Sequence, residues 1–494
     1  MSRHLLVVIA LAVSQLASTH SWAEPTTVAA DLPPHRQLFL DDVMIEQMDG
    51  LRRVLHQPEK YVGNPIIRHH QRPWQKFRAQ LYGTVLYIPE EKIFKMWYLA
   101  GSRFPNEDPI RLKGRLVCPN FQLLAYAESV DGFRWTLPDL DLVDWNGSTH
   151  NNLCDFAREN AEGVAVVYDR GDPDPNRRYK AFYWEHANCG PREFDPVTPV
   201  NAMSVSFSAD GKTWTNHPGN PVIPLASDSG QQAVWDPAMK KYVVYGRFGA
   251  GGRRITRAES DDFVHWSSPK LVFETDTADG PGAQFYGMGT SIYEGVYIGL
   301  PWVYWQDTSN RMDVQLATSR DGIKWQRAGG RQTFIPNGYR GTWDGGCIFT
   351  ATQPLQTVGD TVFIFYSALM LDHEEPRPTV KDRPEYGESS IGVATIRRDG
   401  FVSLSAGEDG GSVTTKPFRL PQGELHINAD ARLGLVLVHV LDASGSILAE
   451  SEVVYGDQMD ATVQFTGAMS PGDVVSLRFV LKSGDLYSYW FASS

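Results

Sequence analysis

One seven-residue pattern, Ser-x-Asp-Gly-x-x-Trp, constrains the fold of this 494-residue chain more than any other feature. It occurs at 129–135, 208–214 and 319–325, in a relaxed form at 260–266, and last as Arg398-Asp399-Gly400-Phe401. Asp-Gly is a strong signal for a tight turn, because glycine accepts a positive φ and aspartate caps its own turn. The five aspartates are 52 to 79 residues apart, and such a spacing marks a modular array.

The segments between these turns share one order of predicted strands. An apolar strand and an aromatic strand precede a third strand that leads into the turn, and a fourth strand begins near the Trp. Four strands in each of five units predict a five-bladed β-propeller. The units are expected at 78–145, 160–225, 228–275, 283–335 and 343–405. Because a circular array must protect its edges, the predicted strand at 37–45 is expected to pair with the last blade and close the ring.

The repeat stops after Gly400, and residues 406–494 alternate apolar and polar positions between Gly- and Asp-rich turns, which predicts a β-sandwich. The chain is therefore expected to be all-β, with a propeller followed by a sandwich. Its expected organisation is a signal peptide at 1–23, a flexible leader at 24–35, the propeller at 36–405 and the sandwich at 406–494.

The N-terminus is typical of an export signal. An apolar run at 5–13 precedes the small residues of Ser21-Trp22-Ala23, so cleavage is expected after Ala23 and the mature protein is expected in the periplasm or outside the cell. The run is too short for the alternative, an anchoring membrane helix. The net charge is −12 with no basic stripe, so neither nucleic acid nor, after signal removal, a membrane is an expected partner. Nothing in the sequence indicates an oligomeric state.

Four cysteines are present: Cys118, Cys154, Cys189 and Cys347. Export permits disulfides, and four cysteines allow three full pairings. Cys347 lies in an apolar run and is expected to be a buried thiol. The spacing of the four matches no zinc-site pattern.

Several short phrases carry a family resemblance: Leu38-Phe39-Leu40-Asp41-Asp42, Asn151-Asn152, Ser319-Arg320-Asp321-Gly322, Arg398-Asp399-Gly400-Phe401 and Thr415-Lys416-Pro417-Phe418. With the five turns and the sandwich, the chain resembles the five-bladed propeller glycosidases of glycoside hydrolase families 32 and 43, and above all a family-32-like branch of secreted bacterial proteins. It lacks the Asn-Asp-Pro-Asn-Gly start and a clear Arg-Asp-Pro motif of family 32.

The resemblance implies a hydrolase that cleaves glycosidic bonds in plant or algal oligo- or polysaccharides. It also implies an essential aspartate on the first strand, which Asp41 or Asp42 would match. Asp42 is the favoured of the two, and a salt-bridged strand terminus is the alternative for it. Related propellers hold a calcium ion in the funnel, for which no ligands are assigned in this chain, and no other cofactor is expected.

Glycoside hydrolysis uses two carboxyl groups on either side of the scissile bond. In a propeller the innermost strands converge, so acids that open these strands meet although they are far apart in sequence. Glu162 opens the second unit, Asp228 precedes the third, and Asp344 opens the fifth beside an aromatic residue and two glycines. These three, with Asp42, are the predicted catalytic residues. The alternatives are a solvated loop acid for Glu162 and a capped turn for Asp228.

Six residues are candidates for binding the sugar: Tyr82, Tyr286, Gln284, Arg247, His373 and Trp74. The first three open innermost strands and would form the walls of the site. Arg247 follows a core strand and would bind a carboxylate or sulfate of an acidic sugar, or else make a structural ion pair. His373 would tune an acid or bind substrate, with a structural role as its alternative, and Trp74 is a sugar platform or plain packing.

Two other functions remain open. A propeller can bind carbohydrate without catalysis, because fold does not determine function. A polysaccharide lyase would need a His or Tyr base near a charge-neutralising Arg, for which His373 and Arg247 are candidates. The sequence contains no Gly-rich phosphate loop, no His-Glu-x-x-His motif and no Gly-x-Ser-x-Gly elbow.

Overall fold

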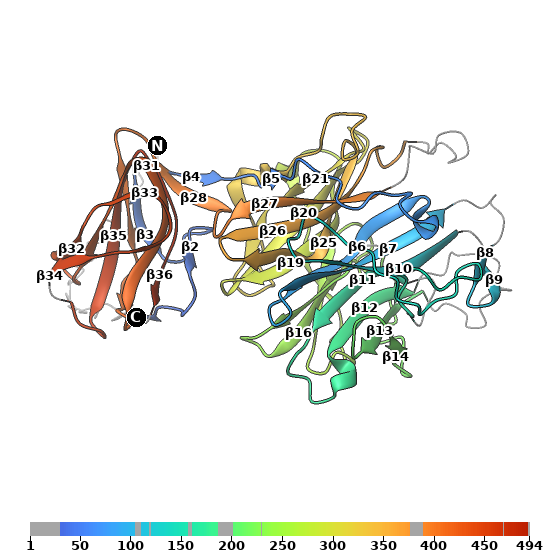
Figure 1. Cartoon of the computed structure of the whole chain (residues 1–494). Coiled ribbons are helices and arrows are strands. Elements are labelled where there is room, and N and C mark those ends of the chain that lie inside the picture. Colours follow the sequence, from blue (N-terminus) through green and yellow to red (C-terminus); the bar gives the residue numbers. More distant parts are fainter. Residues whose placement is uncertain are drawn as a thin grey trace, which may run out of the picture.

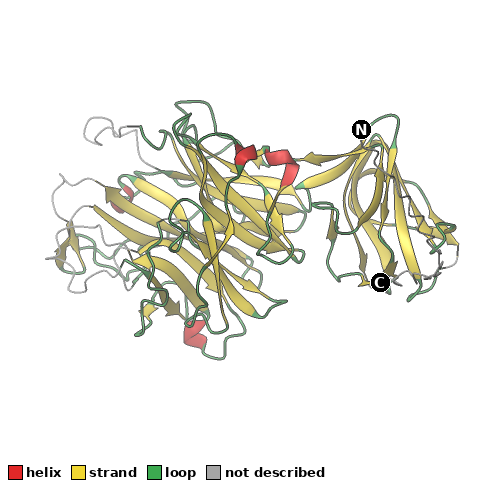
Figure 2. Cartoon of the chain, turned by 180° about the vertical axis from the view of Figure 1, so that it is seen from behind, coloured by secondary structure: helices red, strands yellow, loops and turns green. Residues whose placement is uncertain are grey.

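The computed structural model describes residues 30–103, 110–117, 120–156, 161–185, 201–228, 230–375, 389–467 and 469–492. Two parts built of strands lie side by side and are joined by the antiparallel pair β4 (Leu51–Leu55) and β28 (Val402–Ala406) (Figure 1). Strands dominate both parts when the molecule is seen from behind (Figure 2). Within the described ranges, helix is limited to four 3-10 turns: η1 (Pro73–Gln75), η2 (Pro175–Arg177), η3 (Thr277–Asp279) and η4 (Ala328–Arg331). The predicted all-β class is confirmed.

The larger part contains five groups of antiparallel strands, which we call blades 1 to 5 in chain order. Blade 1 has β6 (Arg78–Ile88), β7 (Ile93–Arg103) and β10 (Asn120–Ser129), with the hairpin β8 (Ile110–Leu112) and β9 (Arg115–Val117) inserted. Blade 2 has β11 (Ala161–Tyr168), β12 (Tyr179–Glu185), β13 (Met203–Ser208) and β14 (Thr215–Asn216). Blade 3 has β15 (Gln232–Asp236), β16 (Lys241–Gly246), β17 (Ile255–Ser260) and β18 (Lys270–Phe273).

Blades 4 and 5 are joined into one sheet by a single residue pair between Met312 and Cys347. Blade 4 has β19 (Ala283–Tyr293), β20 (Val296–Trp305), β21 (Met312–Gln315), β22 (Ala317–Ser319), β23 (Gln326–Arg327) and β24 (Thr333–Ile335). Blade 5 has β25 (Cys347–Val358), β26 (Thr361–Leu369), β27 (Ser390–Arg397) and, from the N-terminal region, β5 (Glu59–Lys60).

The first strands of the five blades are neighbours in a closed ring. β6 contacts β11, β11 contacts β15, β15 contacts β19, β19 contacts β25, and β25 contacts β6 again. Because this chain of contacts returns to its start, the five sheets surround one axis as the blades of a propeller. Each of these five innermost strands begins at the same end of the propeller, which we call the funnel mouth.

The repeated turn is structural, as its recurrence predicts. In the first copy Asp131 Oδ1 accepts hydrogen bonds from the backbone N–H groups of Phe133 and Arg134 at 2.8 Å each, and the Trp135 indole donates to the carbonyl of Gly132 at 3.0 Å. Burial acts in the opposite direction, but these backbone N–H groups hold the pKa of Asp131 below its usual range. The turns at Asp210, Asp262 and Asp321 repeat the two backbone bonds.

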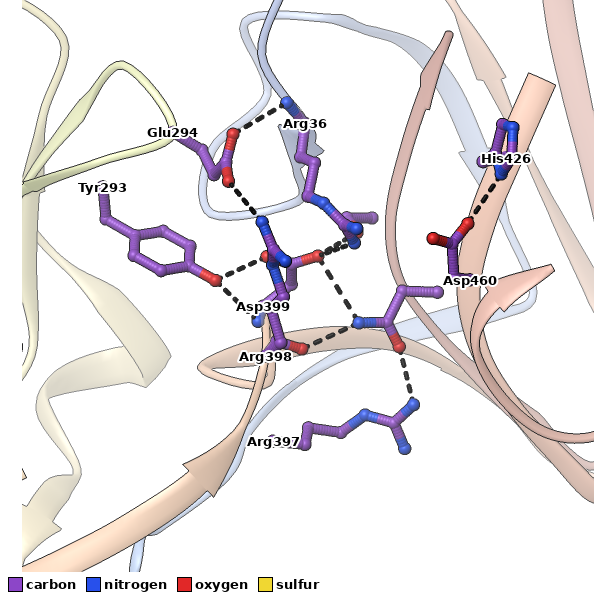
Figure 3. A network of polar contacts seen from close by, with 10 residues as sticks. Arg36, Tyr293, Glu294, Arg397, Arg398, Asp399, His426 and Asp460 are labelled. Atoms are coloured by element: carbon purple, nitrogen blue, oxygen red, sulfur yellow. Dashed lines mark hydrogen bonds and ion pairs between the residues drawn. The ribbon is translucent and has the colours of Figure 1, made fainter. Parts of the chain in front are cut away.

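The last copy of the turn has a different use. The Asp399 side chain is fully enclosed, and it binds the smaller part of the molecule instead of its own turn (Figure 3). Its Oδ2 accepts from Arg36 Nη1 at 2.9 Å and from Ser488 Oγ at 2.6 Å, and its Oδ1 accepts from the Tyr293 hydroxyl at 2.6 Å. The position expected to repeat the blade turn therefore anchors the junction between the two parts.

The predicted ring closure at 37–45 is wrong. Within this stretch β2 (Gln37–Leu38) pairs with β36 (Gly484–Ala492), and the following β3 (Ile45–Asp49) pairs with β29 (Gly411–Thr415), so both belong to the C-terminal sheet. The strand that closes the ring is β5, which pairs with β27. The strand ends at Leu38 in a turn that serves both parts: Leu38 and Leu40 pack into the propeller core, while Phe39 between them packs against the rings of the smaller part.

The smaller part is one continuous sheet folded over its own core. Its long strand β31 (Glu424–Leu441) pairs with β36 through its first half and with β35 (Val474–Lys482) through its second half, so it takes part in both layers. The other strands are β1 (Ala30–Asp31), β30 (Phe418–Arg419), β32 (Ile447–Ser451), β33 (Val454–Thr462) and β34 (Phe465–Gly467). β1 pairs with β30, which corrects the expectation of a flexible leader throughout 24–35.

Candidate active site

Three blades bring their predicted residues together at the funnel mouth. Glu162 stands on β11 of blade 2, Asp228 lies just before β15 of blade 3, and Tyr286 stands on β19 of blade 4. Both carboxylates act electrostatically on the Tyr286 hydroxyl, which is itself buried. Glu162 and Asp228, from neighbouring blades, therefore both act on the same tyrosine at the mouth.

A β-bulge sets the direction of the Glu162 side chain. The pairing of β11 with β12 shifts between Glu162 and Ala165, and Gly163 has a φ of +63° at this point. A Cβ on Gly163 would lie 2.5 Å from the side chain of Gln231, which donates a hydrogen bond to the Glu162 carbonyl at 2.5 Å. The Glu162 carboxylate is buried and accepts a hydrogen bond from Gln122 Nε2 at 3.0 Å. Bulges commonly re-aim side chains beside active sites, and here the bulge places a carboxyl group at the mouth.

Asp228 forms an ion pair with Arg247, the residue after β16. The two partners differ in exposure, because the Arg247 side chain is 6% exposed while that of Asp228 is 53% exposed. The Arg247 guanidinium also lies over the Tyr286 ring, 4.7 Å from its centroid. Of the two predictions for Arg247, the structure contains the ion pair, and it places that pair against a predicted wall of the site.

Tyr286 and His373 are also in contact. The imidazole Nε2 of His373 lies 3.2 Å from the Tyr286 hydroxyl, and its Nδ1 lies 2.7 Å from a carboxylate oxygen of Glu374. Burial and, after it, the Asp228 carboxylate raise the pKa of Tyr286, the Arg247 guanidinium opposes the rise, and the net pKa is about 12. Tyr286 is therefore a neutral hydroxyl at physiological pH, able to donate a hydrogen bond.

Arg253 was not predicted from the sequence, although it belongs to the same cluster. It follows Gly251-Gly252 in the loop between β16 and β17, and its guanidinium lies 5.2 Å from the ring centroid of Tyr286. Its Nη1 donates to the side chain of Gln284 at 2.7 Å. Gln284 is thus at the mouth, as predicted, where it holds an arginine. The only signal in the sequence was the Gly-rich loop that lets the backbone turn toward blade 4.

Asp344 has a different environment. Its Oδ2 accepts from Lys60 Nζ at 2.6 Å, and its Oδ1 accepts from Thr342 Oγ1 at 3.0 Å. Lys60 belongs to β5, the outermost strand of blade 5, and it also donates to the carbonyl of Pro336. The residue expected to be catalytic in blade 5 therefore anchors the strand that closes the ring.

Asp42 lies at the wrong end of the propeller for the predicted role. Its carboxylate is 73% exposed and pairs with Arg53, and the neighbouring Asp41 binds Arg320 of the fourth repeated turn. That turn lies at the end of β19, an 11-residue strand that starts at the mouth. At roughly 3.3 Å per residue the two ends are about 30 Å apart. Asp42 is salt-bridged, as in the alternative interpretation, but it lies in the bend between β2 and β3 and not at a strand terminus.

Tyr82 and Trp74 are both buried among aromatic side chains. Tyr82 stacks on Trp302 with ring centroids 5.8 Å apart, in the core where the innermost strands meet. Trp74 donates its indole N–H to Asn152 at 2.7 Å and packs against Trp145. Packing, the second of the two interpretations, describes Trp74.

Cys154 and Cys347 are buried, as expected for Cys347, whereas Cys118 and Cys189 lie outside the described residues. The predicted signal peptide also lies outside them. In the ranges that the structure covers, no helix is long and apolar enough to cross a bilayer, and no three His, Cys, Asp or Glu side chains are grouped to hold a metal ion.

No protein-family model matches the sequence, and no curated protein matches it. Solved structures do resemble the chain. A glycoside hydrolase family 43 arabinoxylan arabinofuranohydrolase from Bacillus subtilis is 12% identical with a TM-score of 0.44, and the match covers 89% of this chain and 99% of that one. A fructofuranosidase from Schwanniomyces occidentalis is 11% identical with a TM-score of 0.43, covering 89% and 98%. An N-acetylgalactosamine deacetylase from F. plautii is 14% identical with a TM-score of 0.43, covering 71% and 97%.

The chain is thus similar to a family 43 glycoside hydrolase and to a fructofuranosidase, with a TM-score below 0.5 in each case. The deacetylase among these solved structures has a different activity on a sugar. The identities are too low for any of these activities to be transferred to this chain, so function has to be argued from its own residues.

Proposed function

We propose that the protein is an exported glycoside hydrolase whose carboxyl pair is Glu162 and Asp228. The observation that supports the proposal is that two carboxyl groups from neighbouring blades, in unlike environments, both act on the hydroxyl of one buried tyrosine. Pairs of titratable groups whose surroundings differ are the usual basis for separate acid and base roles. The export part rests on the N-terminal sequence alone. A plant or algal oligo- or polysaccharide remains the proposed substrate.

In the proposed reaction Glu162 acts as the general acid. It gives its proton to the glycosidic oxygen while the bond from that oxygen to the anomeric carbon breaks. Asp228 acts as a carboxylate whose negative charge Arg247 compensates. It either attacks the anomeric carbon, to form an ester that water then hydrolyses, or takes a proton from the water molecule that attacks this carbon. Tyr286 donates a hydrogen bond to the bound sugar from its neutral hydroxyl.

The experiment is a screen of the purified chain on neutral and acidic plant and algal oligosaccharides, followed by Glu162→Gln and Asp228→Asn on any substrate that is cleaved. Each change removes an acid–base function that typically contributes about 10²–10⁴-fold, so kcat should fall by that factor. Asp344→Asn is the matched control, because it removes a carboxylate of the same propeller that binds Lys60. Full activity in Glu162→Gln, or loss only in Asp344→Asn, would contradict the assignment.

Binding without catalysis is the outcome if oligosaccharides bind at the mouth and none is cleaved. The contact between Tyr286 and His373, with Arg247 over the tyrosine ring, favours a lyase as the second candidate. A lyase abstracts the proton beside a sugar carboxylate and leaves a double bond in the product. Ultraviolet absorbance of an unsaturated uronate in the product mixture, without uptake of water, would replace the hydrolase by the lyase.

A further inference from the structure

The cluster at the funnel mouth contains an arginine that is held by glutamines and has no carboxylate within ion-pair distance among the described residues. We propose that Arg253 binds an anionic group of the substrate, a carboxylate or a sulfate ester on the sugar. This inference rests on the proposed action on carbohydrate and names the class of sugar that the same site accepts. It concerns binding, so it is tested separately from hydrolysis.

Four side chains of the neighbouring blade fix the Arg253 guanidinium. Its Nη1 donates to the side-chain oxygens of Gln284 at 2.7 Å and Gln306 at 3.4 Å. Its plane of nitrogens lies near two aromatic rings, 5.2 Å from the centroid of Tyr286 and 4.9 Å from that of Tyr304. Arginine loses little conformational freedom on binding when its fork is already oriented in this way.

The donors that remain on Arg253 are available to a ligand. Among the described residues, its Nε and Nη2 have no hydrogen-bond acceptor, and neither atom is fully enclosed by protein. No carboxylate in the described ranges lies within 4.0 Å of this guanidinium, the distance that defines an ion pair. The pKa of Glu374 in the same cluster is lowered by hydrogen bonds with His373 Nδ1 at 2.7 Å and the Tyr304 hydroxyl at 3.1 Å and, more weakly, by the charge of Arg253.

The neighbouring arginines contrast with Arg253. Arg247 pairs with Asp228, and Arg254, the next residue in the chain, pairs with Glu274 at 3.3 Å. A cationic fork held by neutral amides and aromatic rings, with the Glu374 carboxylate acting on it only through space, keeps donors free that match the planar geometry of a carboxylate or two oxygens of a sulfate. A neutral sugar leaves these donors without a charged partner. The site therefore selects a negatively charged sugar.

The test is calorimetric titration of the full chain with three classes of monosaccharide. The carboxylates are glucuronate and galacturonate, the sulfates are glucose 6-sulfate and galactose 6-sulfate, and the neutral sugars are glucose and galactose. We expect one anionic class to bind more tightly than its neutral counterpart, with an affinity that falls as salt is added. The class that binds identifies the anionic group as carboxylate or sulfate.

Arg253→Gln, which keeps a polar side chain and removes the charge, should weaken anionic binding roughly 10- to 100-fold, because hydrogen bonds to charged groups are lost. Arg253→Lys should recover part of that loss, since it restores the charge without the fork. Arg254→Gln is the matched control and should bind as the wild type does. These outcomes support the proposal.

Equal or absent binding of the anionic and neutral sugars, or unchanged affinity in Arg253→Gln, overturns the proposal. The two proposals fail in different ways. Cleavage of oligosaccharides, with anionic sugars bound equally well by wild type and Arg253→Gln, keeps the hydrolase and overturns the anion site. Charge-dependent binding through Arg253, in a protein that cleaves none of the substrates, supports the anion site and contradicts the hydrolase.

Discussion

The change Asp399→Asn should destabilise the junction between the propeller and the C-terminal sheet. It removes the carboxylate that pairs with the Arg36 guanidinium, in a side chain that is fully enclosed (Figure 3). Arg36 is itself only 10% exposed on its side chain, so its guanidinium would be left with little water to replace the carboxylate. In the wild type both carboxylate oxygens accept hydrogen bonds, Oδ1 from Tyr293 and Oδ2 from Arg36 and Ser488. The amide of the variant must therefore turn its N–H group toward one of these donors.

The magnitude follows from these contacts. Breaking a buried ion pair by removing one partner costs about 3–5 kcal/mol. Arg36 retains its position over the Trp490 ring, 3.4 Å from the centroid, which offsets part of the loss. We therefore expect a decrease of about 3 kcal/mol in the free energy of unfolding, at the low end of that range.

Urea unfolding of the full chain, followed by tryptophan fluorescence and by circular dichroism, measures this effect. The matched control is Asp457→Asn, which breaks the bond of 2.7 Å to Arg397 at the same junction. That pair is more exposed, at 34% for Asp457 and 14% for Arg397, so its loss should cost about 1 kcal/mol or less. A smaller destabilisation by Asp399→Asn than by Asp457→Asn would refute the idea that the fifth turn anchors the junction.

Three further outcomes follow from the propeller. Gly163→Ala should destabilise the chain by about 1–3 kcal/mol and lower activity on any substrate, because an L residue is strained at a φ of +63° and the added Cβ meets the side chain of Gln231. Thermal unfolding and enzyme kinetics would measure the two effects. Asp344→Asn should lower the free energy of unfolding by about 1–3 kcal/mol and speed proteolysis of β5, because the partly exposed ion pair with Lys60 anchors this ring-closing strand. Unchanged protease sensitivity would contradict this. Stability should fall in acid, because the pKa of Asp131, Asp210 and Asp321 is depressed in the fold. The contribution of these carboxylates to the free energy of unfolding is full above the unfolded pKa of about 4 and is lost as the pH drops below it. Unfolding midpoints measured between pH 6 and 3 would test this.

The blades were predictable because their information is local. The turn at Asp131 is specified by residues within six positions of one another, so its hydrogen bonds can be read from the pattern. The placement of Glu162 was also predictable, because an acid directly before an apolar run opens an innermost strand. The aspartates that recur in the repeated turn are structural, and the structure bears this out for the first four turns.

The features that were missed depend on partners far away in sequence. Asp344 and Lys60 are 284 residues apart, and Asp399 and Arg36 are 363 residues apart. No local pattern distinguishes an acid that meets a distant lysine from one that faces a sugar. Arg253 was overlooked for the same reason, since its orientation is set by glutamines and tyrosines of the next blade.

The central claim is that Glu162 and Asp228 stand on either side of a glycosidic bond. A crystal structure of the Glu162→Gln variant with an uncleaved oligosaccharide tests it most directly. We expect the glycosidic oxygen within hydrogen-bond distance of the side chain at position 162 and Asp228 on the opposite side of the anomeric carbon. The side-chain carbonyl groups of residues 162 and 228 should be about 5–5.5 Å or 6.5–9.5 Å apart. An oligosaccharide bound away from Glu162, or with both acids on one side of the sugar ring, would contradict it.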